Sequence, residues 1–283
     1  MHILVTGSNG QVGSELQSLA NNYPNFSFVF VDKEDLDIGN QEAVQAFFEA
    51  DTFDYCINCA AYTAVDKAES DKEIAHLVNA LGPQNLALAC QKHQTRLVQI
   101  STDYVYHNSQ NTPFKETDAT SPHSVYGSTK LEGETLALSS NPETLIIRTS
   151  WVYSSFGNNF VKTMIRLGKD RDQLSIIFDQ IGSPTYARDL AKAILDIIQQ
   201  NPSDFTGIYH YSNEGVCSWF DFAQAIFELE EIECKTNPIE TKDYPTPAKR
   251  PHFSLLNKNK IKATFALEIP YWRDSLKACL KLL

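Results

Sequence analysis

The sequence is short of basic residues. Its 24 lysines and arginines stand against 35 aspartates and glutamates, which gives a formal net charge of −11. Nucleic acids and anionic membrane surfaces are both bound through dense basic faces. This charge balance therefore argues against either of them as the main partner. An anionic small substrate is still allowed, provided that basic side chains gather around it.

Long apolar runs are also missing. No apolar stretch approaches the roughly 18 residues that a membrane span requires, and the chain opens on a predicted strand instead of a signal-like segment. We therefore expect a cytoplasmic protein without membrane contact. The 283 residues show no internal repeat and can hold one large α/β domain, or one such domain with a smaller appendage.

Cysteines are few as well. The six that are present have irregular spacings that do not fit a disulfide framework. Cys56 and Cys59 form a C-x-x-C pair, but they lie in a predicted strand, and no second pair is present to complete a zinc site. We interpret them as buried thiols.

The sequence does have a glycine-rich turn at its start. Residues 3–5 predict a buried strand, and Gly7, Gly10 and Gly13 follow before helical spacing begins. Backbone without Cβ atoms can turn sharply and lets a diphosphate approach the N–H groups of the helix start. The first gap is one residue wider than in the usual dinucleotide fingerprint, and such turns also use glycines for packing alone. Its position at the first strand favours cofactor binding.

An acidic residue follows the second predicted strand, residues 26–31. Asp32 lies about twenty residues past the glycine turn, where a carboxylate can bind the adenosine ribose of NADH. The adjacent Lys33 can instead meet the 2′-phosphate of NADPH, so the choice of cofactor stays open. In the next loop, residues 35–38, an apolar side chain can cover an adenine ring, or the loop can simply cap the following helix.

Strands and helices alternate over the first half of the chain. This order predicts an α/β fold with a doubly wound parallel sheet. We place a Rossmann-type NAD(P)-binding domain at residues 1–153, completed by residues 174–200. Residues 154–173 and 201–283 are expected to form a smaller substrate-binding lobe over the carboxyl edge of the sheet.

Three residues carry the predicted catalysis. Thr102 ends a predicted strand, at the sheet edge where such folds bind ligands. Tyr126 and Lys130 are four apart on the next predicted helix and so share one face. An ammonium near a phenol lowers the phenol pKa towards neutrality, which would make Tyr126 a proton donor to a carbonyl oxygen. A lone Tyr-x-x-x-Lys has little weight, but its order after the glycine turn and the hydroxyl pair predicts a reductase site.

A wider set of motifs supports this interpretation. They lie at residues 6–13, 58–69, 101–106, 148–153, 179–185 and 250–251, together with Tyr126 and Lys130. With them, the chain resembles the extended short-chain dehydrogenase/reductases and, within these, the dTDP-4-dehydrorhamnose reductase family, over roughly residues 1–255. Gln11 and the run at 61–69 are narrow to that family, whereas the glycines and Tyr-x-x-x-Lys are shared by many reductases and epimerases.

The resemblance implies an oxidoreductase that uses NADPH or NADH to reduce the C4 keto group of dTDP-4-dehydro-L-rhamnose, in nucleotide-sugar synthesis for cell-surface polysaccharide. Tyr126 would be the acid, Lys130 would tune it and grip the nicotinamide ribose, and Thr102 would orient the carbonyl. The cofactor residues, including the glycines of the turn, are Gly7, Gly10, Gln11, Val12, Gly13, Asp32, Asp37, Ile38, Ala61, Tyr62, Thr63, Tyr126 and Lys130.

The resemblance also implies residues beside the substrate, which are Val65, Thr102, Asp103, Tyr104 and Trp151. Trp151 fits a core position equally well. To these we add Arg250 as a candidate for the substrate diphosphate, because a guanidinium fork suits phosphate oxygens. An ordinary surface arginine would look the same in the sequence.

Departures from the family pattern concern metal most of all. Family members can carry Mg²⁺ where two subunits meet, and Glu15 and Asp189 match two of its positions. Residues 277–281 offer no obvious third acid, so we expect no set of metal-binding residues in this chain. Whether the protein forms a homodimer stays open. Cys59 stands where alanine is usual, and His107 with Asn108 alters the turn after the Thr102 strand.

Two other functions fit the same fold. One is a non-catalytic regulatory subunit, like the β subunit of methionine adenosyltransferase. The presence of Thr102, Tyr126 and Lys130 argues against it. The other is a nucleotide-sugar epimerase, which would keep NAD bound and show no net oxidation of added cofactor.

Overall fold

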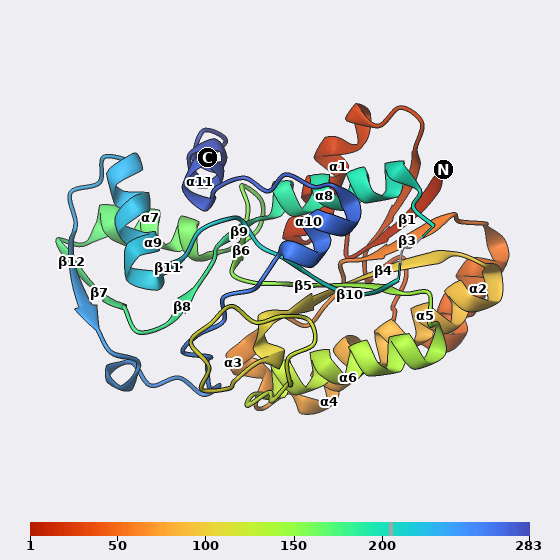
Figure 1. The fold of residues 1–283 in the computed structure, drawn as a ribbon, viewed down its shortest axis with the longest axis horizontal. Helices are drawn as coiled ribbons and strands as arrows, with labels where there is room; N and C mark the ends of the chain where they lie inside the picture. Colours follow the sequence, from red (N-terminus) through yellow and green to blue (C-terminus); the bar gives the residue numbers. More distant parts are fainter. Residues whose placement is uncertain (204–205) are drawn as a thin grey trace.

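A six-stranded parallel sheet forms the centre of the computed structural model, which describes residues 1–203 and 206–283 (Figure 1). Its strand order is β2-β1-β3-β4-β5-β10. The bounds are β1 His2–Thr6, β2 Ser27–Val31, β3 Tyr55–Asn58, β4 Arg96–Thr102, β5 Leu145–Thr149 and β10 Gly207–Tyr211. The order reverses between β1 and β3, which is the switch point where open α/β sheets bind ligands. The predicted doubly wound fold is confirmed.

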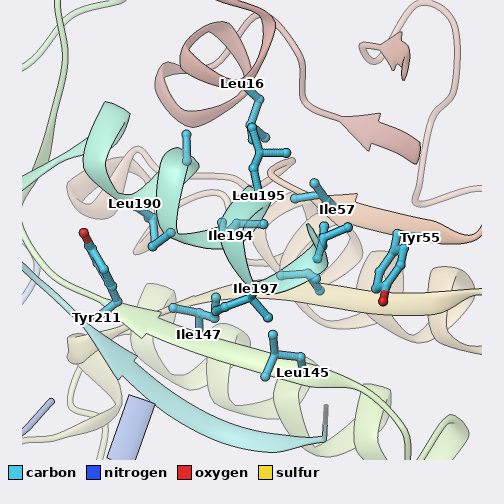
Figure 2. Packing of buried hydrophobic residues seen from close by; sticks show 14 of the residues in the cluster. Leu16, Tyr55, Ile57, Leu145, Ile147, Leu190, Ile194, Leu195, Ile197 and Tyr211 are labelled. Atoms are coloured by element: carbon cyan, nitrogen blue, oxygen red, sulfur yellow. The ribbon is translucent and has the colours of Figure 1, made fainter. Parts of the chain in front are cut away.

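Helices cover both faces of the sheet because its strands are apolar on both sides. Alternate residues of β1 point to opposite faces: Ile3 and Val5 pack with α1 (Gln11–Leu19) and α8 (Ala187–Gln200), whereas Leu4 packs on the other side. Figure 2 shows the first of these cores, with residues of α8 seated on β3 and β5. The other face is covered by α2 (Gln41–Ala50), α5 (Gly82–His93) and α6 (Val125–Ser140).

A second core lies to one side of the sheet and defines the smaller lobe. Strand β7 (Gln173–Ile177) pairs in parallel with β12 (Lys235–Ile239). The helices α7 (Phe160–Asp170), α9 (Trp219–Leu229) and α11 (Trp272–Leu280) pack around them. Two short pairs join this lobe to the sheet: β6 (Val152–Tyr153) with β9 (Thr185–Tyr186), and β8 (Ile181–Gly182) with β11 (Cys217–Ser218).

The expected boundaries need two changes. Residues 207–211 were expected in the smaller lobe but supply β10, the sixth strand of the sheet, beside β5. The segment 174–200 was expected to complete the large domain, but only its α8 part packs on the sheet, because β7 pairs with β12. The division of the chain into two domains stays a prediction.

The helical segment from residue 72 to residue 93 changes its winding part-way along. It consists of α4 (Lys72–His76), a π-helical turn η2 (Leu77–Leu81) and α5. The π turn directly precedes Gly82 and Pro83, and a proline lacks the N–H of the regular pattern. The remaining short elements are η1 (Ala20–Asn22), α3 (Val65–Ala68), η3 (Asp103–Val105), η4 (Thr241–Asp243) and α10 (Asn259–Phe265). Across the two described ranges, no helix has the length and apolar character needed to cross a bilayer.

Candidate active site

The glycine turn lies at the switch point, between β1 and α1. Gly7 has a φ of +63°, and a Cβ atom added there would lie 2.5 Å from the backbone nitrogen of Ala60. Only glycine fits this approach of the turn to the end of β3. Among the described residues, no side chain caps helix α1 at Gly10, so the N–H groups of its first turn are left for a ligand.

Asp32 lies beside this turn, as expected for a residue that contacts the cofactor. Its Oδ2 atom accepts a hydrogen bond from the backbone N–H of Asn9 at 3.0 Å, and its Oδ1 atom accepts one from the N–H of Lys33 at 2.7 Å. The carboxylate thus fixes the glycine turn to the end of β2. Each oxygen keeps a further lone pair with which it could bind a ribose hydroxyl.

The loop at 35–38 does not present an apolar side chain to an adenine ring, which was one of its two predicted roles. Leu36 and Ile38 are each 4% exposed and belong to the core under α2 and α5. Asn85 also donates to the carbonyl oxygen of Ile38 at 2.9 Å. Neither apolar side chain is therefore free to cover an adenine ring. The loop offers a ligand its backbone and the half-buried Asp37, whose Oδ1 atom accepts from the N–H of Gly39.

The segment after β3 is held in place by a buried asparagine. Asn79 accepts from the N–H of Tyr62 at 2.9 Å and donates to the carbonyl oxygen of Tyr62 at 3.1 Å. The Tyr62 hydroxyl donates to Asp71. Ala61 and Val65 are half-buried and Thr63 is exposed, so this segment presents an ordered surface at the carboxyl edge of the sheet.

The three predicted catalytic residues come together at the end of β4. Gly127 lets the start of α6 approach the turn that follows Thr102, because a Cβ atom there would lie 2.5 Å from the carbonyl oxygen of Tyr104. The hydroxyl of Thr102 lies close enough to the Tyr126 phenol to act on its pKa. The buried ammonium of Lys130 donates to the carbonyl oxygen of Ile100 at 2.7 Å.

The predicted pKa shift of Tyr126 is wrong in direction for this structure. Burial raises the pKa of Tyr126 to about 12, and the nearby Thr102 hydroxyl opposes that rise only in part. Burial lowers the pKa of Lys130 to about 8, against the charge of Glu134. The ammonium is bound to β4 and not to the phenol, so it does not set the Tyr126 pKa here.

Two further expected residues follow Thr102 directly. Asp103 is buried, and burial raises the pKa of its carboxyl to about 6, although the nearby hydroxyls of Ser254 and Thr102 oppose that rise. The Thr102 hydroxyl lies 3.2 Å from Asp103 Oδ1. The ring of Tyr104 meets that of Tyr126 edge-on, with centroids 5.4 Å apart.

A cleft of about 860 Å³ lies between the smaller lobe and α3. It is lined by residues of α7, β7 and the stretch 244–250, together with Trp219 and Asp66. Trp151, whose backbone has a φ of +49°, stacks on Trp219 with ring centroids 3.7 Å apart. Trp151 is thus half-buried in the lobe, next to the cleft wall.

Arg250 also lines this cleft, but it is not a free cation. Its guanidinium binds both oxygens of Asp66, at 3.0 and 2.7 Å. Arg250 also donates to the carbonyl oxygen of Ala248 at 3.2 Å. The charges of Arg250 and Asp66 both act on the pKa of Tyr104, which places this pair beside the catalytic residues.

The two acids that match the family's metal positions are bound by protein groups. Glu15 accepts from Ser154 at 2.6 Å and from Arg188 at 3.2 Å. Asp189 accepts from Asn213 and Ser275 through a single oxygen. Among residues 1–203 and 206–283, no cluster of three acidic, histidine or cysteine side chains is arranged to hold a metal ion. These residues do not fit a magnesium site within one chain.

The cysteines are free thiols, as interpreted from the sequence. Cys56 is buried and Cys59 is half-buried. Burial raises the pKa of Cys59 to about 12, so this thiol stays protonated at neutral pH.

Comparison with known proteins adds a family to this geometry. The model of the RmlD substrate binding domain matches residues 1–283. The chain belongs to this family. One relative is a dTDP-4-dehydrorhamnose reductase of Aggregatibacter actinomycetemcomitans. The two chains are 41% identical over 97% of each.

Solved structures of similar proteins agree with the RmlD family assignment. A dTDP-4-dehydrorhamnose reductase of Clostridium acetobutylicum is 44% identical, with a TM-score of 0.95 over 100% of this chain and 99% of that one. A dTDP-4-dehydrorhamnose reductase of Bacillus anthracis, solved in complex with NADP, is 38% identical over the same shares, also with a TM-score of 0.95.

Sequence reasoning missed three residues that this site uses. Glu134 lies one helical turn beyond Lys130, and the spacing of four could have indicated it. Asp66 pairs with Arg250, and Trp219 stacks on Trp151. No local pattern predicts those two contacts, because each joins segments far apart in the chain.

Proposed function

We propose that the protein is an NAD(P)H-dependent reductase that converts the C4 keto group of dTDP-4-dehydro-L-rhamnose into the hydroxyl of dTDP-L-rhamnose. The observation that carries this proposal is the meeting of Thr102, Tyr126 and Lys130 at the end of β4, at the carboxyl edge of the sheet and two strands from the glycine turn. The substrate is the one that the names of its relatives in the RmlD family state.

The residues of the glycine turn fit a dinucleotide. The close approach of Gly7 to β3 and the uncapped start of α1 provide backbone donors for a diphosphate. The residues that would hold the cofactor are Gly7, Gly10, Gln11, Val12, Gly13, Asp32, Asp37, Ile38 through its backbone, Ala61, Tyr62, Thr63, Tyr126 and Lys130. When bound, NADPH or NADH supplies the hydride for the reduction.

Tyr126 supplies the proton. With a pKa of about 12, its phenol is protonated at neutral pH and can donate to the oxygen of the C4 carbonyl. Thr102 lies beside that phenol and orients the same oxygen. Lys130 would bind the nicotinamide ribose through its buried ammonium. The proton transfer from Tyr126 contributes a factor of about 10²–10⁴ to the rate.

The nucleotide sugar would extend from Tyr126 towards the cleft that Asp66 and Arg250 line. Val65, Asp103, Tyr104 and Trp151 would contact its sugar, and Arg250 would bind its diphosphate. Because Arg250 already binds Asp66, the diphosphate would share the guanidinium or replace the carboxylate. This competition makes Arg250 a weaker anion site than a free arginine.

The proposal also covers the location of the protein, its assembly and its partners. We propose a cytoplasmic enzyme that can form a homodimer and that works on a dTDP-sugar, without nucleic acid or membrane as a partner. We propose no role for Mg²⁺, because Glu15 and Asp189 are engaged by side chains of the same chain.

The test is to incubate the purified protein with dTDP-4-dehydro-L-rhamnose and either NADPH or NADH. The proposal predicts one cofactor oxidised for each dTDP-L-rhamnose formed, as measured by absorbance and by chromatography. An epimerase would convert the sugar without net oxidation of added cofactor. A regulatory subunit would do neither, and either outcome would refute the proposed reduction.

A further inference from the structure

One face of α6 meets the end of β4 in a regular pattern. Three side chains, spaced four apart on the helix, each contact one of three successive residues of the strand. The contacts are Tyr126 with Thr102, Lys130 with Ile100, and Glu134 with Ser101. The first two belong to the catalytic residues already described. The third has no part in that account.

Glu134 is fully buried and fully bonded. Its carboxylate accepts from the Ser101 hydroxyl at 2.5 Å and from Arg148 Nε at 2.9 Å. A second nitrogen of Arg148 lies 2.5 Å from Glu134 Oε2, and both side chains are 3% exposed. Because Arg148 lies on β5, the carboxylate fastens α6 to two neighbouring strands.

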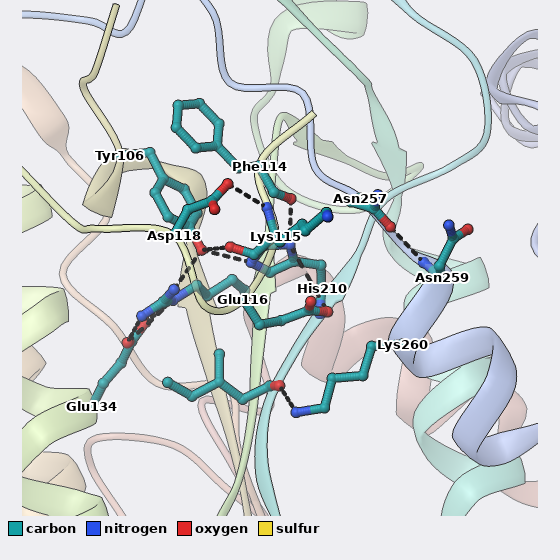
Figure 3. A network of polar contacts seen from close by, with 12 residues as sticks. Tyr106, Phe114, Lys115, Glu116, Asp118, Glu134, His210, Asn257, Asn259 and Lys260 are labelled. Carbon is teal, nitrogen blue, oxygen red and sulfur yellow. Dashed lines mark hydrogen bonds and ion pairs between the residues drawn. The ribbon is translucent and has the colours of Figure 1, made fainter. Parts of the chain in front are cut away.

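The hydrogen-bond network around Glu134 continues away from the active site. Arg148 also donates to the hydroxyl of Tyr106, which lies 2.8 Å from Nε2 of His210 (Figure 3). Burial and the charge of Arg148 lower the pKa of His210 to about 3, so the imidazole is neutral. Because His210 is neutral, the charge that balances the Glu134 carboxylate in this network is that of Arg148.

Glu134 also acts on the charge of Lys130. The titratable groups that face Lys130 are Glu134 on the same helix and the Cys59 thiol at the end of β3. The thiol is neutral at neutral pH, because burial raises its pKa to about 12. Tyr126 is neutral as well. Among the residues that the structure describes, Glu134 is thus the charged group that opposes the effect of burial on the Lys130 pKa.

We propose that Glu134 is a positioning residue of the reductase site. Through Ser101 and Arg148 it fixes the face of α6 that presents Tyr126 and Lys130, and its carboxylate keeps Lys130 charged. This inference rests on the proposed function for its kinetic part. The part that concerns the charge of Lys130 can be measured without substrate or cofactor.

The test compares Glu134→Gln with a matched control, Glu132→Gln. Glutamine keeps the shape of Glu134 and removes its charge, whereas Glu132 lies on the exposed side of α6 and pairs with His76 at 3.1 Å. In protein labelled with [¹⁵Nζ]lysine, the Lys130 signal, assigned by its loss in Lys130→Met, is followed against pH. Glu134→Gln should move its titration to lower pH by about one unit, and Glu132→Gln should leave it unchanged.

The kinetics should follow the titration. Activity that needs a charged Lys130 falls as the pH rises through its pKa, so the alkaline limb of kcat should move down by the same unit in Glu134→Gln. At pH 8 this amounts to about a fivefold loss, with little change in KM for the sugar. A folded Glu134→Gln protein whose Lys130 titration and alkaline limb match the wild type would overturn the proposal.

A second pair of variants covers the case in which Glu134→Gln does not fold. Ser101→Ala removes one bond of Glu134 but keeps its charge, so kcat should fall about threefold to tenfold while the limb stays in place. Glu134→Asp keeps the charge, so the alkaline limb of its kcat profile should lie where it does in the wild type. Its maximal kcat should still be lower than that of the wild type. If neither variant changes kcat, the positioning role is wrong. A wild type that oxidises no cofactor would refute the proposed function instead, and the lysine titration would still decide the charge effect.

Discussion

The guanidinium of Arg250 binds both carboxylate oxygens of Asp66, across 184 positions of the sequence. The pair joins α3, which follows the end of β3, to the stretch at 244–250 that forms one wall of the cleft. Ala248 strengthens this link, because its N–H donates to Asp66 at 3.2 Å. The contact therefore shapes the substrate cleft as well as placing a cation in it.

Loss of this cation should weaken substrate binding more than turnover. Arg250→Ala should raise KM for the dTDP-sugar about tenfold or more, because one charge-assisted hydrogen bond is worth about 1.5–3 kcal/mol. The value of kcat should change little. Steady-state kinetics against Lys249→Ala, an exposed neighbour, give the comparison. An unchanged KM in Arg250→Ala would remove Arg250 from the substrate set.

The Thr102 hydroxyl should matter for the chemical step. Thr102→Val keeps the shape of the side chain but removes the hydroxyl that acts on Tyr126, so kcat should fall about tenfold to a hundredfold. The control is Thr135→Val, on the exposed side of α6, where the lost bond is only to the carbonyl oxygen of Leu131. Equal rates in the two variants would contradict the role of Thr102.

Burial of Asp103 makes a prediction about stability and pH. The pKa of this carboxyl in the folded protein, about 6, lies above its ordinary value of 3.8. The folded state therefore binds the proton more tightly, and stability falls as the pH rises from about 4 to about 6, by about 3 kcal/mol at most. Asp103→Asn lacks this titration. The free energy of unfolding of the wild type minus that of Asp103→Asn should thus decrease over that range.

Chemical denaturation at pH 4, 5, 6 and 7 measures this difference. Asp118→Asn is a control of opposite sign, because the N–H of Lys115 and the amide of Gln110 hold the pKa of Asp118 below its ordinary value. The contribution of Asp118 should change little between pH 7 and pH 4 and be lost only as the pH falls below its ordinary pKa of 3.8. A constant difference for Asp103→Asn across the four values would mean that its carboxyl is not destabilised by burial.

Removal of divalent metal should leave the activity intact. Glu15 accepts three hydrogen bonds and Asp189 two from side chains of the same chain, and the described residues hold no cluster of three acidic, histidine or cysteine side chains that could bind a metal. Dialysis against EDTA should therefore change neither kcat nor KM for the dTDP-sugar. An activity that EDTA abolishes and Mg²⁺ restores would show that a metal is needed after all.

Much of the large domain was predictable because its signals are local. An apolar run before three glycines specifies a strand, a turn and a helix, and a spacing of four places Tyr126 and Lys130 on one face. The partner of a strand is not local. Residues 173–177 and 207–211 are both short apolar strands, and only contacts with distant segments place the first beside β12 and the second beside β5.

The site was predictable in its members but not in its electrostatics. The order of Thr102, Tyr126 and Lys130 indicates a reductase. The direction of the Tyr126 pKa depends on burial and on where the Lys130 ammonium points, and neither can be read from the spacing. The same holds for Ile38, whose side chain turns into the core, and for Arg250, whose partner Asp66 lies in another part of the chain.

The central claim is that Tyr126 gives the proton during reduction of the dTDP-sugar. The most direct test is the initial rate of reduced-nicotinamide absorbance loss with dTDP-4-dehydro-L-rhamnose, in wild type, Tyr126→Phe and Tyr23→Phe. Tyr23 is a matched control because its hydroxyl donates to Asp196, away from the site. The account predicts a rate about 10²–10⁴ lower in Tyr126→Phe and near the wild-type rate in Tyr23→Phe. A Tyr126→Phe enzyme as fast as the wild type would contradict it.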